Sequence, residues 1–309
     1  MLAKSFLFYR MSEHTLPLLP TRDFIASPHA TFRLEDHATD QTGLLPDKKA
    51  AQKVRSAQLE RLQQLQDLLY ADQRYALLLI FQGTDASGKD STIKHVMSGV
   101  NPQGCKVVSF KEPNSTELNH DFLWRSYRAL PRKGRIGIFN RSYYEDVIVP
   151  KVHPELILRQ QLPDIHTYED IGSDFWEQRY RSINEMERHL HRNGTLILKF
   201  FLHLSAGEQK KRLLKRIRKP VKQWKFAASD WQERTYWDQY CQAFEETVNH
   251  TSTEEAPWYI IPADHKWYMR TLISRIVVEQ LERLDLRYPS LSEAQRAQLE
   301  KARKRLEED

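Results

Sequence analysis

The stretch GTDASGKD, residues 83–90, combines residue types that bind phosphate with two carboxylates. Gly83, four further residues, Gly88 and Lys89 have the spacing of a phosphate-binding loop, in which glycines let backbone N–H groups turn toward phosphate oxygens. An apolar run precedes the loop and a helical pattern follows it. An ordinary strand-to-helix turn is the alternative, but the lysine in register favours the phosphate site. The residues expected to contact phosphate here are Gly83, Ala86, Ser87, Gly88 and Lys89.

Two aspartates in this stretch are unusual for an anion site. A carboxylate among phosphates would be repelled unless a divalent cation lay between them, and Mg²⁺ prefers one or two carboxylates plus substrate phosphates. We therefore interpret Asp85 as a metal carboxylate, or as a base that orients the attacking phosphate. Asp90 stands where such loops usually have a Ser or Thr for magnesium. It occupies the first turn of a helix, where a negative charge is favourable, so a structural role within the phosphate site is our interpretation.

A second charged group follows the apolar stretch RIGIFN. Such a stretch brings the chain to the carboxyl edge of a parallel sheet, where ligands of open α/β folds bind. Asn140 stands where an aspartate is common, and Arg141 offers a guanidinium fork that fits phosphate oxygens. We expect catalytic roles for Arg141 and Glu145, a phosphate contact for Asn140, and a metal held by Glu145 together with Asp85. Asp146 also fits the solvated start of a helix.

A run of cations without an acid extends from residue 210 to residue 225. Ser205 and Glu208 have the spacing of a capping box, and Leu213, Leu214 and Ile217 predict one buried stripe of a helix that Pro220 ends. Such a run is usually a solvated face or a nucleic-acid patch. Because it follows a strand of the sheet that carries the phosphate loop, we predict a lid that closes over the transferring phosphate. The lid residues expected to contact phosphate are Arg212, Lys215, Arg216 and Arg218.

These sites need a scaffold, and the hydrophobic pattern predicts one. Dense apolar runs predict strands at 75–81, 106–110, 135–140, 195–204 and 258–263. Helical patterns occur at 47–70, after residue 89, at 118–130, at 170–192 and after residue 205. Two further helices are expected after the last strand, the final one at about 292–308. Strands that alternate with helices predict an α/β fold with a mostly parallel central sheet and helices on both faces.

The composition is typical of a globular protein without a membrane-spanning segment. The 309 residues are 40% hydrophobic and 28% charged with a net charge of +6, which excludes a disordered chain and leans weakly toward an anionic partner. No stretch approaches the roughly 18 apolar residues of a membrane span. Cys105 and Cys241 lack metal-ligand spacing, and the N-terminal apolar run is too short for a signal peptide. We expect a cytoplasmic protein.

The chain has no internal repeat and no low-complexity linker. We predict an irregular arm at 1–46, a single domain at 47–290 with a lid at about 208–230, and a C-terminal helix at 291–309.

The stretches FQGTDASGKDSTIKHV, GRIGIFNRSYYEDVIVPKVHPE and KRLLKRIRKPVKQWKF together resemble the polyphosphate kinase 2 family, whose fold is similar to thymidylate kinase. The resemblance runs from residue 50 to about 285. It implies a three-layer P-loop kinase-like fold with a helical lid, and reversible phosphoryl transfer between inorganic polyphosphate and a nucleoside mono- or diphosphate. It further implies Mg²⁺, with Mn²⁺ as a substitute, a purine acceptor, and a homodimer or homotetramer.

One detail of the resemblance concerns the subgroup. Asn140, Arg141 and Ser142, in place of Asp-Arg-Ser, resemble the single-domain members that phosphorylate nucleotides. ADP or GDP would then become ATP or GTP, with AMP to ADP as a further step. The family's loop aspartate, here Asp85, would hold metal and substrate phosphates together.

A polyphosphate chain carries about one negative charge per phosphate, so its channel must neutralise a line of charge. The cations expected to supply that line, besides the lid, are Lys89, Lys94, Arg141 and Lys151. The nucleotide phosphate that attacks is already ionised, so no strong base is needed.

Two other functions stay open. An ATP-dependent nucleoside or nucleotide kinase would use the same loop, but Asp90 replaces the Ser or Thr that an ATP loop expects. A nucleic-acid binder would use the cationic run, but it has no need of Asp85 and Glu145 near its phosphate site. We therefore expect no nucleic-acid partner and no membrane partner.

Overall fold

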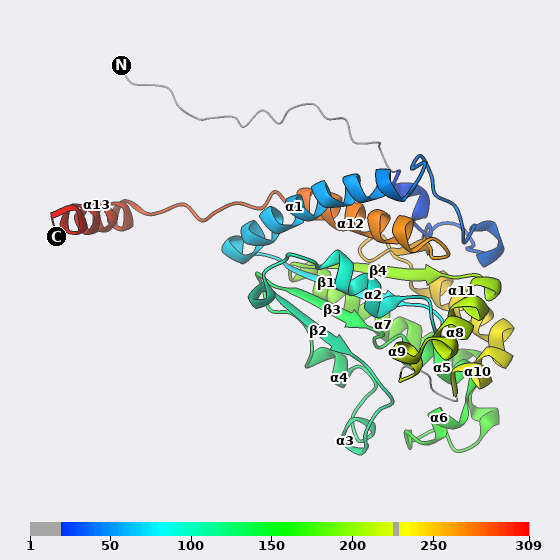
Figure 1. Ribbon diagram of the computed structural model, residues 1–309. Helices are drawn as coiled ribbons and strands as arrows, with labels where there is room; N and C mark the ends of the chain where they lie inside the picture. The colour runs from blue at the N-terminus through cyan, green and yellow to red at the C-terminus, as the bar shows by residue number, and fades with distance from the viewer. Residues whose placement is uncertain (1–19, 225–228, 309) are drawn as a thin grey trace.

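The computed structural model describes residues 20–224 and 229–308, and its centre is a five-stranded parallel sheet (Figure 1). The strand order is β2-β3-β1-β4-β5, and every neighbouring pair is parallel. The strands are β1 (Ala76–Gln82), β2 (Cys105–Ser109), β3 (Ile136–Asn140), β4 (Thr195–His203) and β5 (Trp258–Pro262). The predicted α/β fold is confirmed, and each predicted strand is present with ends that agree within one residue.

Helices cover both faces of the sheet, which makes three layers (Figure 1). Leu77, Leu79 and Phe81 of β1 pack on one face, and Leu78 and Ile80 pack on the other. Because both faces are covered, β1 is a continuous apolar run instead of an alternating one. The first face carries α1 (Lys48–Asp72), α2 (Lys89–Val96) and α12 (Lys266–Glu282), and the second carries α5 (Glu145–Val152), α7 (Ser173–Arg192) and α11 (Trp237–Thr251).

The ends of the long helices follow local sequence signals. The side chain of Asp47 caps α1 by accepting a hydrogen bond from the Ala50 N–H at 2.8 Å. Helix α7 ends at Asn193 and Gly194, and the φ of Gly194 is 87°, a left-handed conformation that suits glycine. Both predicted helices are therefore present.

The single helix predicted at 118–130 is wrong. Two short helices, α3 (Ser115–Leu118) and α4 (Trp124–Tyr127), stand there instead. The side chain of Asn114 caps the first, and the Asp121 carboxylate accepts a hydrogen bond from the Leu123 N–H at 2.9 Å, which starts a new turn. The short helices α6 (Glu155–Leu158), α9 (Pro220–Gln223) and α10 (Ser229–Gln232), and the longer α11, were not predicted.

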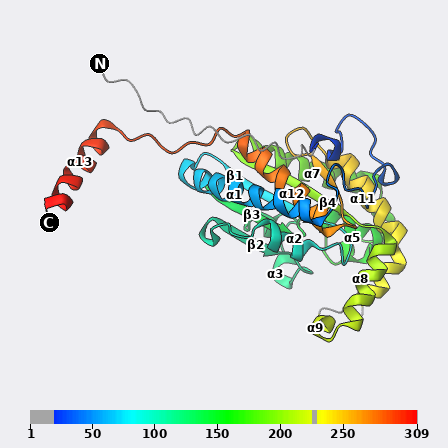
Figure 2. The same ribbon diagram turned by 45° about the horizontal axis from the view of Figure 1, so that its top comes forward.

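The helix predicted after Ser205 is α8 (Ala206–Arg218), and with α9 it extends beyond the body of the sheet (Figure 2). Ser205 caps α8, but Glu208 pairs with Arg212 instead of completing the capping box. Pro220 ends α8 as predicted. Residues 225–228 of the predicted lid lie outside the described residues.

The two ends of the chain differ. The described part of the N-terminal arm is irregular apart from 3-10 turns at Arg22–Phe24 and Leu34–Asp36, and it is held by the buried side chains of Phe24 and Phe32. Residues 1–19 lie outside the described part. Helix α13 (Glu293–Glu308) has no buried residue and stands apart from the body (Figures 1 and 2). Within residues 20–224 and 229–308, no helix is long and apolar enough to cross a membrane.

Candidate active site

The loop between β1 and α2 has the backbone of an anion cradle. The φ angles of Gly83, Ala86 and Gly88 are 147°, 61° and 107°, so three residues of the loop have left-handed or related conformations. A Cβ atom at Gly83 would lie 2.9 Å from the Leu202 carbonyl oxygen, which leaves no room for a side chain. The buried hydroxyl of Ser87 has no hydrogen-bond partner among the described residues. A polar atom of this kind at the N-terminus of a helix is what an anion site provides.

Lys89 is the first residue of α2, and its side chain folds back under the loop. The ammonium donates hydrogen bonds to the carbonyl oxygens of Gly83 at 2.6 Å and Thr84 at 3.3 Å. Burial and, second, the Arg141 guanidinium lower the pKa of Lys89, while Asp85 and Glu145 oppose that shift. Lys89 therefore lies close enough to Arg141, Asp85 and Glu145 to interact electrostatically with all three.

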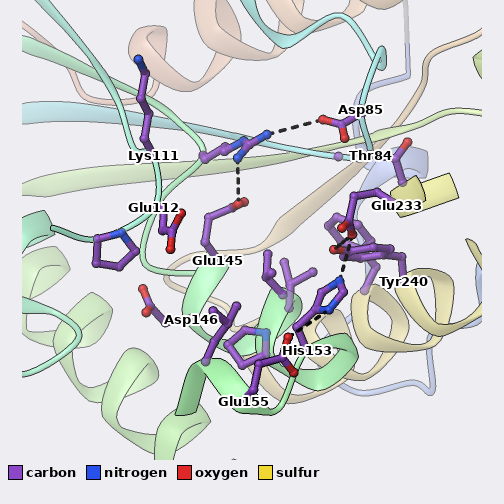
Figure 3. A pocket seen from close by; sticks show the side chains of 18 of the residues that line it. Thr84, Asp85, Lys111, Glu112, Glu145, Asp146, His153, Glu155, Glu233 and Tyr240 are labelled. Carbon is purple, nitrogen blue, oxygen red and sulfur yellow. Dashed lines mark hydrogen bonds and ion pairs between the residues drawn. The ribbon is translucent and has the colours of Figure 1, made fainter. Parts of the chain in front are cut away.

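Arg141 connects the two predicted carboxylates (Figure 3). It follows β3 with a φ of 64°, and its N–H donates to the Phe81 carbonyl oxygen at 3.0 Å, which extends the β1–β3 pairing by one residue. One guanidinium nitrogen lies 3.4 Å from Asp85 Oδ1, and the other lies 3.5 Å from Glu145 Oε2. The Glu145 carboxylate, despite burial, raises the pKa of Arg141. The structure thus brings all four predicted catalytic residues, Asp85, Lys89, Arg141 and Glu145, to one place.

Asp90 and Asn140 form a second contact between the loop helix and β3. The Asn140 side-chain amide donates to Asp90 Oδ1 at 2.6 Å. Asp90 is exposed, and neither residue is among those that line the cavity described below. This geometry fits the structural interpretation of Asp90.

A cavity of about 580 Å³ opens beside the loop. Thr84 and Asp85 lie at one end of it, and His153 and Glu155 lie at the other (Figure 3). The wall between them comes from residues 111–113, α5, α6 and α11. This volume suits a small organic ligand, and its wall mixes apolar side chains with charged ones.

Four cations of the cavity wall escaped the sequence analysis: Lys111, Arg125, Arg159 and Arg234. Lys111 lies two residues after the end of β2, at the carboxyl edge of the sheet. Because ligands of open α/β folds bind at that edge, this position could have identified Lys111 from the sequence. The other three come from separate segments that only the fold brings together.

Asp146 is buried, so its interpretation as the solvated start of a helix is wrong. The residue is 6% exposed, and its carboxylate accepts a hydrogen bond from the Arg125 guanidinium at 3.2 Å. Arg125 also donates to the Lys111 carbonyl oxygen at 2.7 Å, so this pair fixes the 111–113 segment at the cavity. Burial raises the pKa of Asp146 to about 6, although Arg125 and Arg179 oppose the shift.

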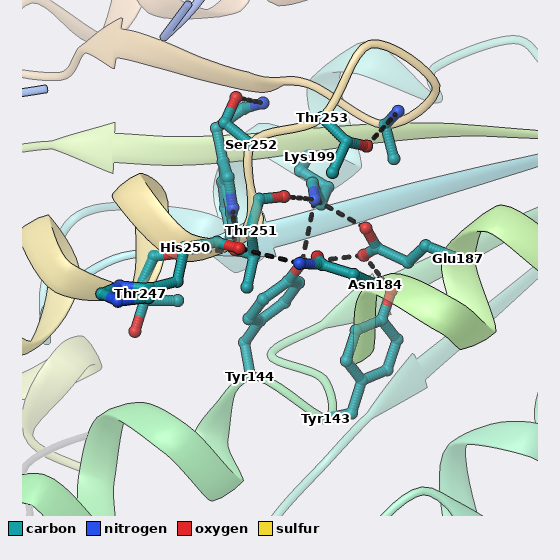
Figure 4. A network of polar contacts seen from close by, with 12 residues as sticks. Tyr143, Tyr144, Asn184, Glu187, Lys199, Thr247, His250, Thr251, Ser252 and Thr253 are labelled. Carbon is teal, nitrogen blue, oxygen red and sulfur yellow. Dashed lines mark hydrogen bonds and ion pairs between the residues drawn. The ribbon is translucent and has the colours of Figure 1, made fainter. Parts of the chain in front are cut away.

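A buried polar network holds the segment between Arg141 and Glu145 in place (Figure 4). The hydroxyls of Tyr143 and Tyr144 donate to Glu187 Oε1 at 2.7 and 2.8 Å. The Lys199 ammonium lies 2.7 Å from Glu187 Oε2 and also donates to the Thr251 carbonyl oxygen. The charges of Lys199 and Glu187 are buried and paired, so loss of one would leave the other buried without a partner, which is strongly destabilising. The network therefore fixes where Arg141 and Glu145 emerge.

The family model of polyphosphate kinase 2 matches residues 45–289. The chain belongs to this family. It is 53% identical over 249 residues to the ADP-polyphosphate phosphotransferase of Rhodopseudomonas palustris, covering 81% of this chain and 85% of the relative. It is 44% identical over 269 residues to the AMP/ADP-polyphosphate phosphotransferase of Meiothermus ruber, covering 87% and 95%.

The crystal structure of polyphosphate kinase 2 from Arthrobacter aurescens TC1 superposes with a TM-score of 0.79 at 35% identity, covering 90% of this chain and 98% of that one. The predicted family and its P-loop kinase-like fold are confirmed. So is the predicted enzyme class, a polyphosphate-dependent phosphotransferase. The roles of individual residues stay predictions.

Helix α8 of this family member carries the predicted lid cations, and Arg212 differs from the rest. Arg212 points into the body and is 9% exposed. Its five N–H groups donate to the Glu208 carboxylate and to the carbonyl oxygens of Ala86, Ser87, Ala263 and Asp264. No donor is left over for a phosphate, so Arg212 anchors the loop to the end of β5.

The other predicted cations are placed as follows. Lys215 and Arg218 are exposed on α8, whereas Arg216 is half-buried. Leu214 and Ile217 are 38% and 45% exposed, so the predicted buried stripe of α8 is wrong beyond Leu213.

Two predicted phosphate contacts lie away from the cavity. Lys151 pairs with Glu246 and lies 4.8 Å above the Trp176 ring centroid, so its charge is already engaged. Lys94 is exposed on α2. Neither is among the described residues that line the cavity.

Proposed function

We propose that this chain transfers the terminal phosphoryl group of inorganic polyphosphate to a nucleoside di- or monophosphate, reversibly. The observation that carries the proposal is the cluster of Lys89, Asp85, Arg141 and Glu145, of which the last three line a cavity of about 580 Å³. A phosphate loop meets a nucleotide-sized cavity there. The names of the relatives, ADP-polyphosphate and AMP/ADP-polyphosphate phosphotransferase, support the same substrates.

The chemistry needs positioning and charge neutralisation more than proton transfer. The loop N–H groups and Lys89 hold the terminal phosphates of the donor, and the nucleotide lies in the cavity with its phosphate toward Arg141. An oxygen of that nucleotide phosphate forms a new bond to the terminal phosphorus. The bridging P–O bond to the remaining chain breaks, and its electron pair stays on the shortened polyphosphate.

Asp85 and Glu145 fit a divalent cation. Their carboxylates converge on one guanidinium at the loop, and hard oxygen donors of this number suit Mg²⁺ when substrate phosphates complete the shell. Bound there, Mg²⁺ or Mn²⁺ would neutralise charge on the transferring group. Among the described residues, no cluster of three or more His, Cys, Asp or Glu side chains could hold a metal by itself, so substrate phosphates must contribute ligands.

The acceptor is proposed to be a purine nucleotide: ADP or GDP, and AMP in a further step. Apolar side chains of α5 and α11, including Val149, Trp237 and Phe244, line the cavity and offer surface for a base. We also propose that the enzyme works in the cytoplasm as a homodimer or homotetramer.

The test measures ATP formation from ADP with Mg²⁺ and polyphosphate as the only donor. We expect turnover that requires polyphosphate and stops when EDTA is added. Phosphorylation of a nucleoside or nucleotide by ATP, with none by polyphosphate, would instead assign the chain to the ATP-dependent nucleotide kinases.

A further inference from the structure

The N-terminal arm, described from residue 20 to residue 46, contacts both sides of the active site without entering it. Nearly all of it precedes residue 45, where the match to the family begins. The blue segment that leads to α1 lies beside α11 (Figures 1 and 2). None of the described arm residues is among those that line the cavity. Any effect of the arm on catalysis must therefore act through the elements that it contacts.

One part of the arm pairs with α11. The Phe32 N–H donates to Asn249 Oδ1 at 2.7 Å, and Asn249 Nδ2 donates back to the Phe32 carbonyl oxygen at 2.9 Å. The Leu34 N–H donates to the Glu245 carboxylate at 2.7 Å. The side chains of Phe32 and Leu34 are buried in the same apolar cluster as Phe244, which also lines the cavity. The arm is thus packed against the wall beside which the nucleotide is proposed to bind.

Asp264, just after β5, joins another part of the arm to α8. The Thr39 hydroxyl donates to Asp264 Oδ2 at 3.0 Å, and the Asp264 N–H donates to the Thr39 carbonyl oxygen at 3.0 Å. The other carboxylate oxygen of Asp264 accepts from the N–H of Ser205, the residue that caps α8, at 2.9 Å. The Asp264 carbonyl oxygen accepts from Arg212 at 3.0 Å. One residue therefore connects the arm, the start of α8 and the arginine that anchors the loop.

The first turns of α8 in turn hold the phosphate loop. The Gln209 side-chain amide donates to the Asp85 carbonyl oxygen at 3.1 Å, and Arg212 donates to the carbonyl oxygens of Ala86 and Ser87 at 3.1 and 2.9 Å. Gln209 and Arg212 are 3% and 9% exposed, so water does not compete freely for these contacts. The position of α8 therefore determines the position of the loop backbone.

We propose that arm residues 32–39 set the placement of the phosphate loop relative to the nucleotide side of the cavity, with Asp264 and Asn249 as positioning residues. This inference rests on the proposed function, in which the donor lies on the loop and the acceptor lies in the cavity. The path of contacts runs from the loop through α8 and Asp264 to the arm, and from the arm through Asn249 to α11. In-line transfer requires the attacking oxygen and the phosphorus to be close and aligned, so a small misplacement lowers the rate even when each substrate still binds. The arm should therefore affect kcat more than KM.

The test compares two hydroxyl-to-carboxylate contacts of the arm. Thr39→Val removes the donor to Asp264, whereas the control Thr21→Val removes a donor to Glu279 of α12 at 2.7 Å, away from α8 and α11. We expect kcat for ADP and polyphosphate, measured well below the thermal midpoint, to fall about three- to tenfold in Thr39→Val alone, with both KM values within about twofold of the parent. A merely structural contact would lower the thermal midpoint in both variants and leave kcat unchanged.

Asp264 offers a rescue by a conservative variant. Asp264→Ala removes both carboxylate contacts, and we expect kcat to fall about tenfold or more. Asp264→Asn keeps an oxygen for the Ser205 N–H and gains an amide that can donate to the Thr39 hydroxyl, so its kcat should stay within about twofold of the parent. Thr39→Val added to Asp264→Ala should cause little further loss, because the contact is already absent. If Asp264→Ala does not fold, Thr39→Val and its control still carry the test.

Hydrogen–deuterium exchange of the substrate-free protein supplies a readout that does not depend on activity. Exchange at residues 84–88 and 205–212 should be faster in Thr39→Val than in the parent and unchanged in Thr21→Val. Parent-like kcat in Thr39→Val and Asp264→Ala, or equal changes in Thr39→Val and Thr21→Val, would overturn the proposal. A parent enzyme that forms no ATP from polyphosphate would instead refute the proposed function, and the exchange comparison would then decide whether the arm positions the loop.

Discussion

Asp85 and Glu145 face each other across one guanidinium, and this arrangement leads to a prediction about metal dependence. If both carboxylates bind Mg²⁺ with the substrate phosphates, Asp85→Asn and Glu145→Gln should each raise the Mg²⁺ concentration for half-maximal rate by about tenfold or more. Rates measured across a magnesium titration check this. Glu155→Gln is the control, because Glu155 lines the far end of the same cavity. A magnesium dependence unchanged in both test variants would remove the metal role.

Asp146 should make stability depend on pH in a direction opposite to that of most acids. Burial raises its pKa in the folded protein from 3.8 to about 6, so the folded state takes up this proton first as pH falls. The group therefore adds stability as pH falls from about 6 to about 4, and that contribution is lost as pH rises through 6.

Asp146→Asn should remove this dependence. The difference in unfolding free energy between parent and variant should change by about 2–3 kcal/mol between pH 7.5 and pH 4. Urea denaturation at both pH values measures it. Parallel changes in parent and variant would show that the carboxyl group has an ordinary pKa.

Individual residues were predictable from sequence only where their neighbours in the chain carried the signal. The spacing of Gly83, Gly88 and Lys89 is local, and the structure places all three at the loop as expected. The pairing of Asp146 with Arg125 joins residues 21 positions apart, and no periodicity encodes it. The charge pattern predicted Arg212 as a lid cation. Most of its partners are backbone carbonyl oxygens, and the sequence of charged side chains does not reveal such partners.

At the scale of elements, α8 combines an anchor with an exposed cationic face, and the two parts should respond differently to mutation. Lysine has three donors where Arg212 uses five, so Arg212→Lys leaves buried carbonyls unpaired, at about 1–3 kcal/mol each. We expect a lower unfolding free energy and a kcat at least about tenfold lower, with unchanged salt sensitivity.

Arg218→Ala is the contrasting variant on the same helix. Arg218 is exposed, so its loss should leave stability within about 0.5 kcal/mol. If the lid contacts polyphosphate, that loss should weaken use of long polyphosphate and flatten its salt dependence. Steady-state rates at two salt concentrations and thermal denaturation distinguish the pair. Identical responses of the two variants would contradict this division of α8.

The sequence predicted the secondary-structure elements best where both faces of the element are buried, as in the strands of the central sheet. All five strands were apparent because a strand covered on both faces is a dense apolar run. The stretch 118–130 failed because Asp121 breaks it through a side-chain contact that competes with the helix. Helix α11 buries Ala243, Phe244 and Val248, so an apolar stripe was present but was not interpreted.

At the scale of the whole molecule, α13 is set apart from the catalytic body. None of its described residues is buried, and the family match ends at residue 289. Deletion of residues 290–309 should therefore leave kcat, KM and the thermal midpoint of the body unchanged. Activity assays and calorimetry of the shortened chain check this, and size-exclusion chromatography shows whether α13 is an oligomer contact. A large loss of activity without a change in oligomeric state would contradict this separation.

The central claim is that a phosphoryl group passes directly from polyphosphate to a nucleotide at Lys89. The measurement is a single-turnover reaction of unlabelled ADP with terminally ³²P-labelled polyphosphate, resolved by product. We predict ³²P in the γ-phosphate of ATP with the parent, and a rate reduced by about a hundredfold or more in Lys89→Ala, which should bind ADP normally. Label that appears only as inorganic phosphate, or near-parental transfer by Lys89→Ala, would contradict the account.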